Sequence, residues 1–330
     1  MKDIDTLNKS MATVAMTTQF MNDVDQGLSS KEKTLPSKYF YDKIGDALFV
    51  QIMHLPEYYV TRAEHEIFKN QSLEIISALN LDPDYYFELI ELGAGDGTKT
   101  KELLKELTDG KYKFDYMPVD ISQNALDNLE TDLQDTLADV SVQTKQGDYF
   151  EVLQSLKENK RPKVILFLGS NIGNMDDETA ADFISKLSNS LQENDKVFLG
   201  VDLIKEESVV LPAYDDSQGI TAAFNLNLLT RINNELDADF DLGLFEHRPE
   251  YKESDGIAKS YLVSTTDQEV YIASLNKTFH FAKEEKILME ISRKYNDEIL
   301  NTILSDTRFE IKTRITDSQK YFANYVLEVK

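Results

Sequence analysis

Cysteine is absent from the sequence, and histidine occurs only four times. The missing thiols exclude disulfide bonds and thiolate metal sites, and they fit a reducing compartment. The four histidines, at His54, His65, His247 and His280, show no spacing typical of metal ligands. We therefore expect structural roles for the histidines and no bound metal.

Positive charge is also scarce, because 35 Lys and Arg residues face 59 Asp and Glu residues, for a net charge of −24. Nucleic-acid binding rests on clustered Lys and Arg, so we expect no nucleic-acid partner. No run approaches about 18 apolar residues, and the opening MKDIDTLNKSMATVAMTTQF is too polar for a signal peptide. These features predict a cytoplasmic protein that handles a small molecule away from membranes. Nothing suggests an obligate interface, so we expect a monomer.

An alternation of strands and helices begins near residue 85. The expected strands are 85–93, 114–120, 140–148, 163–170 and 195–203. Short apolar strands separated by amphipathic helices predict a parallel α/β sheet that is covered on both faces. The final segments RFEIKTRITD and YFANYVLEVK predict a closing antiparallel hairpin.

Two segments fall outside this alternation. Residues 1–80 are polar and helical, and residues 204–285 mix a helical stretch with β-like runs. Open α/β sheets bind ligands at the carboxyl ends of their strands, and both segments are candidates to cover that edge. We therefore expect a core of 61–203 and 286–330, and a substrate-binding subdomain of 1–60 and 204–285.

The segment ELGAGDGTKT places Gly93, Gly95 and Gly97 at a turn from strand to helix. Glycines at such a turn permit positive φ and let backbone N–H groups approach a ligand closely. The G-x-G-x-G spacing differs from the G-x-G-x-x-G dinucleotide fingerprint and is closer to the turn that binds S-adenosylmethionine. A dinucleotide loop and a plain tight turn remain as alternatives.

Acidic residues end the next two strands. Asp120 is suited to accept hydrogen bonds from ribose hydroxyls, although Asp also caps helices well. Asp148 and Tyr149 could hold an adenine amino group and pack its ring, or Asp148 could be an ordinary strand-end acid. Together with the glycine turn, these acids favour a ligand that contains a nucleoside.

A second glycine-bounded turn, FLGSNIGNM (Phe167–Met175), follows the apolar KVIL. It could be a simple strand exit, or backbone and amide groups in it could hold a small polar substrate. Ser170 and Asn171 suit the turn itself, and the pattern suggests no further role for them.

Long stretches of the chain resemble the histidine-specific N-alpha-methyltransferase family, which makes the betaine hercynine on the way to ergothioneine. The stretches are LPSKYFYDKIGDALFVQIMHLPEYYVTRAEHEI, ELGAGDGTKT, FLGSNIGN, AYDDSQGITAAFNLNLLTRINNELDADFDL, FEH and MEIS. The resemblance implies a class I, Rossmann-like methyltransferase fold with a mostly parallel seven-stranded sheet, a C-terminal antiparallel hairpin and a substrate-binding subdomain. It also implies S-adenosylmethionine as the cofactor and N-methylation of the α-amine of free L-histidine.

The resemblance also implies site residues. For the cofactor these are Gly93, Gly95, Lys99, Asp120, Asp148 and Tyr149. For the amino acid they are Tyr58, Gly169, Asn174, Tyr214, Glu290 and Ser292, with Tyr41 and Gly169 nearest the reacting amine. An Asn amide and a Tyr hydroxyl suit a substrate carboxylate, and Glu, Ser and a second Tyr can orient an imidazole ring.

Each of these side chains has a plainer alternative. Lys99 could be a solvated helix lysine, the tyrosines could be packing residues, and Glu290 could lie on the solvent face of a strand. Ser260 stands where relatives can place a larger apolar residue, which could loosen discrimination against bigger aromatic amino acids. The first alternative function is therefore methylation of tyrosine or tryptophan. The second is a sensor that binds S-adenosylmethionine and an amino acid without turnover, and the third is a dinucleotide oxidoreductase.

Overall fold

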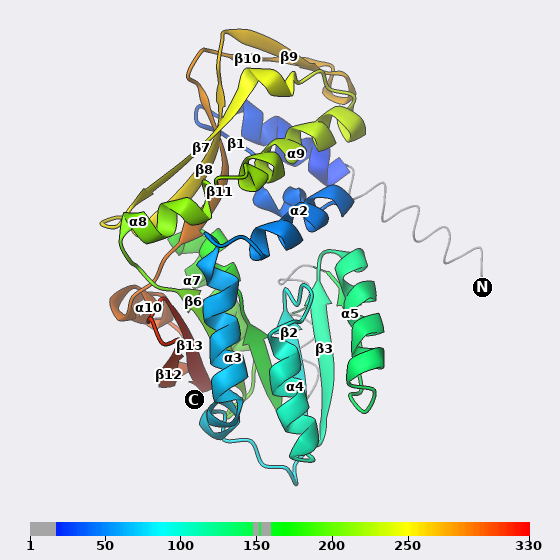
Figure 1. Ribbon diagram of the computed structural model, residues 1–330, viewed down its shortest axis with the longest axis vertical. Coiled ribbons are helices and arrows are strands. Elements are labelled where there is room, and N and C mark those ends of the chain that lie inside the picture. The colour runs from blue at the N-terminus through cyan, green and yellow to red at the C-terminus, as the bar shows by residue number, and fades with distance from the viewer. Residues whose placement is uncertain (1–17, 148–151, 153–159) are drawn as a thin grey trace, which may run out of the picture. The chain divides into compact units, whose positions relative to one another are not determined.

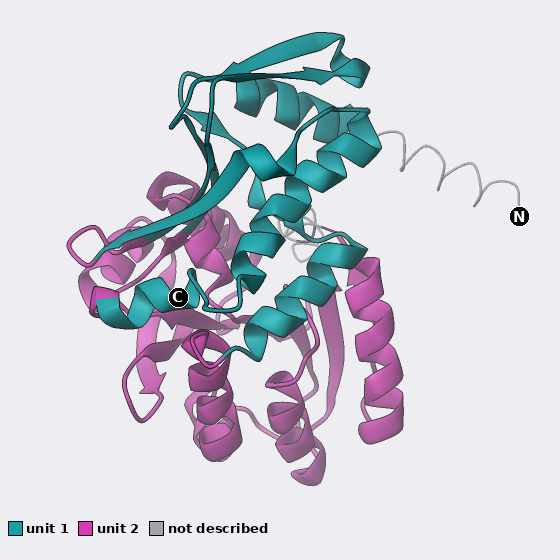
Figure 2. Cartoon of the chain, turned by 45° about the horizontal axis from the view of Figure 1, so that its top comes forward, with its two compact units in different colours: residues 1–55, 208–252, 258–291 teal, residues 56–207, 253–257, 292–330 magenta. Residues whose placement is uncertain are grey.

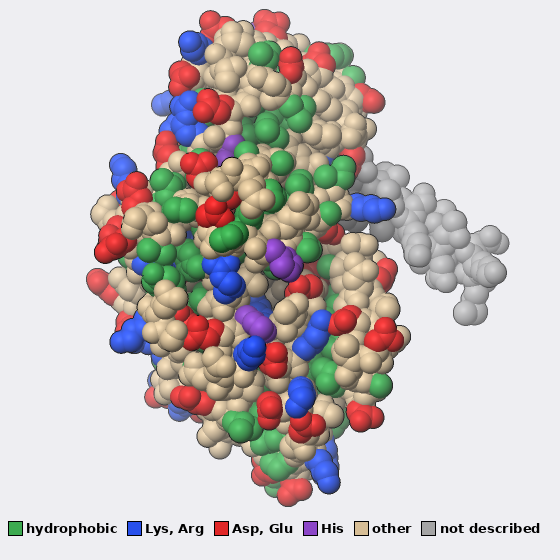
Figure 3. Space-filling view, viewed as in Figure 1, with side chains coloured by type: hydrophobic (Ala, Val, Ile, Leu, Met, Phe, Trp, Pro, Cys, Tyr) green, Lys and Arg blue, Asp and Glu red, His purple; other side chains and the backbone are tan. Residues whose placement is uncertain are grey.

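The computed structural model of this chain describes residues 18–147, 152 and 160–330. The chain forms two compact units, shown in Figure 2: unit 1 comprises 1–55, 208–252 and 258–291, and unit 2 comprises 56–207, 253–257 and 292–330. Within the described ranges, no helix is both long enough and apolar enough to cross a membrane. On the face drawn in Figure 3, Lys and Arg side chains are interspersed with acidic ones.

Unit 2 is built on a seven-stranded sheet in the order β12-β13-β6-β5-β2-β3-β4. The strands are β2 (Phe87–Leu92), β3 (Phe114–Asp120), β4 (Lys145–Gln146), β5 (Lys163–Phe167), β6 (Lys196–Asp202), β12 (Phe309–Thr316) and β13 (Phe322–Val329). Strands β2 to β6 run parallel, whereas β13 is antiparallel to both β6 and β12. The predicted mostly parallel sheet with a closing antiparallel hairpin is thus confirmed.

Helices cover both faces of this sheet, which is why its central strands can be apolar on both sides. The helices are α3 (Tyr59–Ala78), α4 (Thr100–Asp109), α5 (Gln123–Thr136), α7 (Asp177–Ser190) and α10 (Asp297–Leu304). Figure 1 shows α3 and α4 in front of the sheet. Helices α7 and α10 pack against each other, in the hydrophobic core that contains Phe167 and Phe183. A side-chain cap marks the start of α5: the Ser122 Oγ accepts from the Ala125 N–H at 3.2 Å, as expected of the predicted N-cap.

The third predicted strand, 140–148, is mostly wrong. The structure has only the two-residue β4, preceded by an isolated bridge between Tyr116 and Val142. Ser141 and Gln143 are exposed, so this edge segment gains little from packing and pairs only briefly with β3. Asp148 lies outside the described residues.

Unit 1 contains a four-stranded sheet in the order β1-β11-β8-β7 and a separate β9-β10 hairpin. Its elements, of which α8, β8 and β11 each extend by one or two residues into unit 2, are β1 (Lys33–Thr34), η1 (Ser37–Phe40), α2 (Lys43–Met53), α8 (Glu207–Val210), η3 (Leu211–Ala213), α9 (Ile220–Leu236), η4 (Leu242–Leu244), β7 (Phe245–Lys252), β8 (Ile257–Ser264), β9 (Gln268–Ile272), η5 (Ala273–Leu275), β10 (Lys277–Phe281) and β11 (Lys286–Arg293). Helix α2 packs against α9 around an aromatic cluster of Phe40, Phe49 and Phe224.

The two compact units are bounded differently from the two expected domains. Residues 56–60, 204–207 and 253–257 belong to unit 2, and 286–291 belong to unit 1. Compactness alone does not test which part of the chain binds the substrate. The division into a core and a substrate-binding subdomain therefore stays a prediction about function.

Candidate active site

The glycine turn after β2 is open. Gly93, Gly95 and Gly97 all have positive φ, at 74°, 57° and 63°. A Cβ added at Gly95 would meet no atom of the described residues within 4 Å, whereas one at Gly97 would lie 2.5 Å from a Leu129 methyl carbon. Gly97 therefore allows close packing of the helix after the turn, and Gly95 leaves free space at the strand's carboxyl end.

Asp120, at the end of β3, is tied to this turn. Its Oδ2 accepts the Gly95 N–H at 3.0 Å, and its Oδ1 accepts the Ser122 N–H at 2.9 Å. A carboxylate has about four lone-pair sites, so one group can both hold this turn and accept from a ligand hydroxyl. The helix cap of α5 is Ser122, not Asp120, so the capping alternative for Asp120 is wrong.

Glu64, on α3, joins three parts of unit 2. Its carboxylate is fully buried, and it accepts from the Lys99 Nζ at 2.5 Å, the Gly169 N–H at 2.8 Å and the Asn324 amide at 2.9 Å. Lys99 keeps 20% of its side chain exposed, and an ammonium has three donors. Lys99 can therefore pair with Glu64 and still donate to a ligand carboxylate.

Glu91, two residues before Gly93, is a second buried acid beneath the open turn. The Tyr116 hydroxyl donates to it at 2.5 Å and the Thr100 hydroxyl at 2.8 Å. Burial raises the pKa of Glu91 to about 7, against the opposing effect of these hydrogen bonds. The acid in the glycine motif thus titrates near neutral pH.

The turn after β5 is closed by the protein itself. Gly169 and Ser170 both have positive φ, and the buried Ser170 Oγ accepts the Asp202 N–H at 3.0 Å. A Cβ added at Gly173, in η2 (Asn171–Asn174), would lie 2.7 Å from the Arg293 carbonyl oxygen. The sequence suggested no role for Ser170 beyond the turn, and the structure shows that it ties β5 to β6.

The structure brings some predicted site residues together within unit 2. A Cβ at Gly169 would lie 3.4 Å from the Lys99 Nζ, so the two turns approach each other through that lysine. Tyr58 precedes α3 and is half-buried, Asn174 is exposed at the end of η2, and Ser292 is 7% exposed. Tyr149, like Asp148, lies outside the described residues.

The other predicted residues belong to unit 1. Tyr41 is half-buried and meets the rings of Phe49 and Phe224 edge-on, at centroid distances of 5.7 and 5.9 Å. Tyr214 is 7% exposed. Glu290 lies on β11 and is half-buried rather than fully exposed.

Ser260 lies on β8, the strand beside β11 in the four-stranded sheet. It is 1% exposed, and its buried hydroxyl oxygen has no hydrogen-bond partner among the described residues. A larger apolar side chain would leave no such unsatisfied group, so this serine is an unusual choice for a packed position.

Asp202, at the end of β6, is the functional candidate that sequence reasoning missed. Its buried carboxylate accepts from Tyr59 and from two lysines, Lys205 and Lys294. Burial works to raise the pKa of Asp202, but Lys294 and Lys205 outweigh it and hold the pKa below its usual value. Its position at the end of a strand, like that of Asp120, is the sequence feature that could have identified it. Glu64 gave a weaker signal, because a glutamate on a helix is usually solvated.

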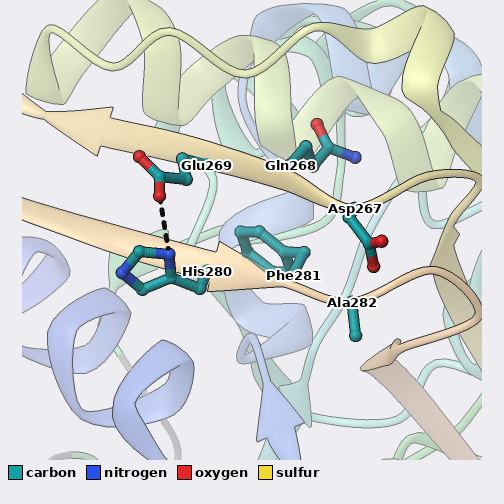
Figure 4. A pocket seen from close by; sticks show the side chains of 6 residues that line it. All are labelled: Asp267, Gln268, Glu269, His280, Phe281 and Ala282. Carbon is teal, nitrogen blue, oxygen red and sulfur yellow. Dashed lines mark ion pairs between the residues drawn. The ribbon is translucent and has the colours of Figure 1, made fainter.

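A hollow of about 400 Å³ lies on the β9–β10 hairpin of unit 1 (Figure 4). Its lining residues are Asp267, Gln268, Glu269, His280, Phe281 and Ala282. The exposed Glu269 and His280 form an ion pair at 3.1 Å, and none of the predicted site residues lines the hollow. Across the described part of the chain, no group of three or more His, Cys, Asp or Glu residues could hold a metal ion.

The order of the seven strands, with antiparallel β13 between β6 and β12, and the open glycine turn linked to Asp120, define a class I S-adenosylmethionine-dependent methyltransferase. The family model of the histidine-specific, SAM-dependent methyltransferases matches residues 20–329. The chain belongs to that family.

Two relatives are similar over most of their own length. The chain is 38% identical to the histidine N-alpha-methyltransferase of Mycolicibacterium smegmatis, over 84% of each chain. It is 36% identical to the enzyme of the same name from Mycobacterium tuberculosis, over 86% of each. A more distant relative is the L-tryptophan methyltransferase of Psilocybe serbica, at 24% identity over 82% of each chain.

Proposed function

We propose that this protein transfers methyl groups from S-adenosylmethionine to the α-amine of free L-histidine, and that the final product is the trimethyl betaine hercynine. The observation that carries this proposal is the match to the histidine-specific family over residues 20–329. The similarity to two histidine N-alpha-methyltransferases over most of each chain supports it.

S-adenosylmethionine supplies the methyl group, and we propose that the edge of the seven-stranded sheet in unit 2 holds it. Asp120 would accept from the ribose hydroxyls, and Lys99 would donate to the carboxylate of the cofactor. The free space at Gly95 fits a ligand that packs closely against the backbone. Gly93 would contribute in the same way, and Asp148 with Tyr149 remain the predicted contacts of the adenine.

For the amino acid, we propose that Tyr58 and Asn174 donate to the carboxylate, while Tyr214, Glu290 and Ser292 orient the imidazole. These types match the substrate, because a carboxylate needs donors and a neutral imidazole offers one donor and one acceptor. We further propose that the amino-acid contacts come from the 1–60 and 204–285 subdomain as well as from the core.

The reaction is a direct displacement at the methyl carbon, so positioning contributes most of the rate and no covalent enzyme intermediate is needed. The amine attacks with its lone pair, so its proton must first leave to solvent or to a nearby oxygen. Each transfer removes one N–H donor, so the site cannot depend on a full set of hydrogen bonds to nitrogen. We propose that the Gly169 carbonyl and the Tyr41 ring face the amine as its positive charge becomes permanent.

Tyrosine or tryptophan is the alternative substrate, and the small Ser260 is the residue that favours it. Glu290 and Ser292 together argue for histidine, because imidazole offers one N–H and one lone-pair nitrogen, whereas the indole of tryptophan offers only an N–H. The non-enzymatic alternative is a sensor that binds both ligands.

Incubation of the purified protein with S-adenosylmethionine and, in separate reactions, L-histidine, L-tyrosine or L-tryptophan separates these possibilities. We expect S-adenosylhomocysteine and trimethylated histidine, with fragmentation placing all three methyl groups on the α-nitrogen. A sensor would show a rise in melting temperature with both ligands and no S-adenosylhomocysteine. Methylation of tyrosine or tryptophan without methylation of histidine would make one of them the substrate.

We also propose that the protein works as a monomer in the cytoplasm. Light scattering coupled to size-exclusion chromatography should give the mass of a single 37.7-kDa chain. A dimer mass would contradict this proposal without affecting the proposed reaction.

A further inference from the structure

The Ser292 hydroxyl has a defined direction. The Lys294 Nζ lies 2.9 Å from the Ser292 Oγ. An ammonium group only donates hydrogen bonds, so the serine oxygen is the acceptor in this contact. The hydroxyl proton must therefore point elsewhere.

No acceptor for that proton occurs among the described residues, where Lys294 is the one hydrogen-bond partner of the Ser292 hydroxyl. Ser292 is 7% exposed, and a buried donor without an acceptor is costly. Ser292 follows Glu290 by two residues along β11. A ligand that meets the Ser292 hydroxyl therefore encounters a hydrogen-bond donor.

Lys294 is held in place by a buried carboxylate. It is 1% exposed, and its Nζ lies 2.8 Å from the Asp202 Oδ2. The same oxygen accepts from the Tyr59 hydroxyl at 2.8 Å. Because Asp202 keeps its charge, it stabilises the ammonium form of Lys294, which is the form that cannot accept a proton from Ser292.

We propose that Lys294 is a positioning residue that makes the Ser292 hydroxyl an obligatory donor to an unprotonated ring nitrogen of the substrate. This inference rests on the proposed function and deepens it. The pair of Ser292 and Glu290 then selects a side chain that carries one lone-pair nitrogen and one N–H, as neutral imidazole does. A phenyl ring, or an indole with only an N–H, would leave the hydroxyl without an acceptor.

Lys205 provides a matched control. It also donates to Asp202, and its side chain is 8% exposed, but its hydrogen bonds go to Tyr59, Asp202 and Leu203 and not to Ser292. If Lys294 served only to balance the buried charge of Asp202, Lys205→Met and Lys294→Met would have similar effects on substrate binding.

The test uses Ser292→Ala, Lys294→Met, the double variant and Lys205→Met, with L-histidine and with 2-pyrrolylalanine. Pyrrole keeps the ring N–H but has no lone-pair nitrogen. We expect Lys294→Met to raise the KM for histidine about tenfold and to lower the preference for histidine over 2-pyrrolylalanine by a similar factor. The KM for S-adenosylmethionine should change less than about twofold, which also shows that the variant is folded.

The double variant decides whether Lys294 acts through Ser292. In the Ser292→Ala background, Lys294→Met should change the KM for histidine by less than about twofold, because coupled residues are not additive. An additive effect, an equal effect of Lys205→Met, or an unchanged KM in Lys294→Met would overturn the positioning role. If Ser292→Ala itself left the histidine KM unchanged, the role proposed for Ser292 in the substrate site would fail as well. The proposed reaction fails only if the wild type does not methylate histidine.

A second measurement needs no variant. The imidazole of free histidine takes up a proton below pH about 6.5 and then offers no acceptor. The ratio of the KM for histidine to that for 2-pyrrolylalanine should rise about tenfold per pH unit below this value, and titration of the α-amine cancels in the ratio. A ratio that stays flat or falls as the pH decreases would overturn the proposal.

Discussion

The turns after β2 and β5 lie at the carboxyl ends of neighbouring parallel strands, yet they are built in opposite ways. The turn after β2 leaves open space at Gly95, whose N–H donates to the Asp120 carboxylate. The turn after β5 is filled: Glu64 accepts from Gly169, and Gly173 packs directly on the Arg293 backbone. The comparison teaches that Gly95 leaves space, which we propose the cofactor fills, whereas Gly173 makes room for the protein itself. Substitutions should therefore weaken cofactor binding at the first turn and stability at the second.

The largest effect should come from Glu64→Ala. It would leave Lys99, the Gly169 N–H and the Asn324 amide without their shared acceptor, and loss of one partner of a buried ion pair costs about 3–5 kcal/mol. Urea unfolding measures this loss of free energy. Glu66→Ala, on the same helix, is the control, because Glu66 accepts from the Ser318 N–H in an exposed contact, and the substitution should cost less than about 1 kcal/mol. Equal losses in the two variants would contradict the role of Glu64.

The second-largest effect is a pH dependence of the free energy of unfolding, which Glu91 beneath the open turn should cause. Since the folded-state pKa is raised from 4.5 to about 7, the folded state binds a proton in this range that the unfolded state has released. The stabilisation is complete below pH 4.5 and is lost as the pH rises through about 7, by about 3 kcal/mol in total. The unfolding free energy of the wild type minus that of Glu91→Gln should fall by this amount as the pH rises across the range. A constant difference would show that Glu91 does not titrate there.

The third-largest loss of stability is expected at the closed turn after β5. Gly173→Ala forces a methyl group against the Arg293 carbonyl oxygen, and we expect a loss of about 2 kcal/mol in the free energy of unfolding. The KM for S-adenosylmethionine should remain within about twofold of the wild-type value. A variant as stable as the wild type would show that the turn is looser than the structure indicates.

The smallest loss of stability is expected at the open turn after β2. Gly95→Ala adds a methyl group that meets no atom in the part of the chain that the structure describes, so the expected cost in stability is that of the positive φ, about 1 kcal/mol. The same methyl group would enter the space proposed for the cofactor, and the KM for S-adenosylmethionine should rise at least about tenfold. Steady-state kinetics and urea unfolding of the same preparation separate the two quantities. A stability loss without a change in KM would reverse our comparison of the turns.

The sequence predicted the parts of this fold that depend on local pattern. The bounds of β3, the Ser122 cap and the antiparallel hairpin follow from apolar runs and capping chemistry, and the structure contains all three. The expected strand 140–148 shortened because an edge segment with polar side chains has little to pack against.

The buried charge networks could not be predicted in this way. Glu64 and Lys294 look like ordinary solvated residues in the sequence, and they are buried only because the fold places partners from distant segments around them. The glycine turn and the strand-end acids proposed for the cofactor came from local pattern, and Lys99 and the amino-acid contacts came from similarity to a family. The residues that hold them in place required the three-dimensional contacts.

A competition experiment tests the central claim most directly. Equal concentrations of L-histidine, L-tyrosine and L-tryptophan are mixed with S-adenosylmethionine and the wild-type protein, and the methylated products are quantified by mass spectrometry. We predict that trimethylated histidine accounts for nearly all of the transferred methyl groups. Predominant methylation of tyrosine or tryptophan, or no methylated amino acid at all, would contradict the account.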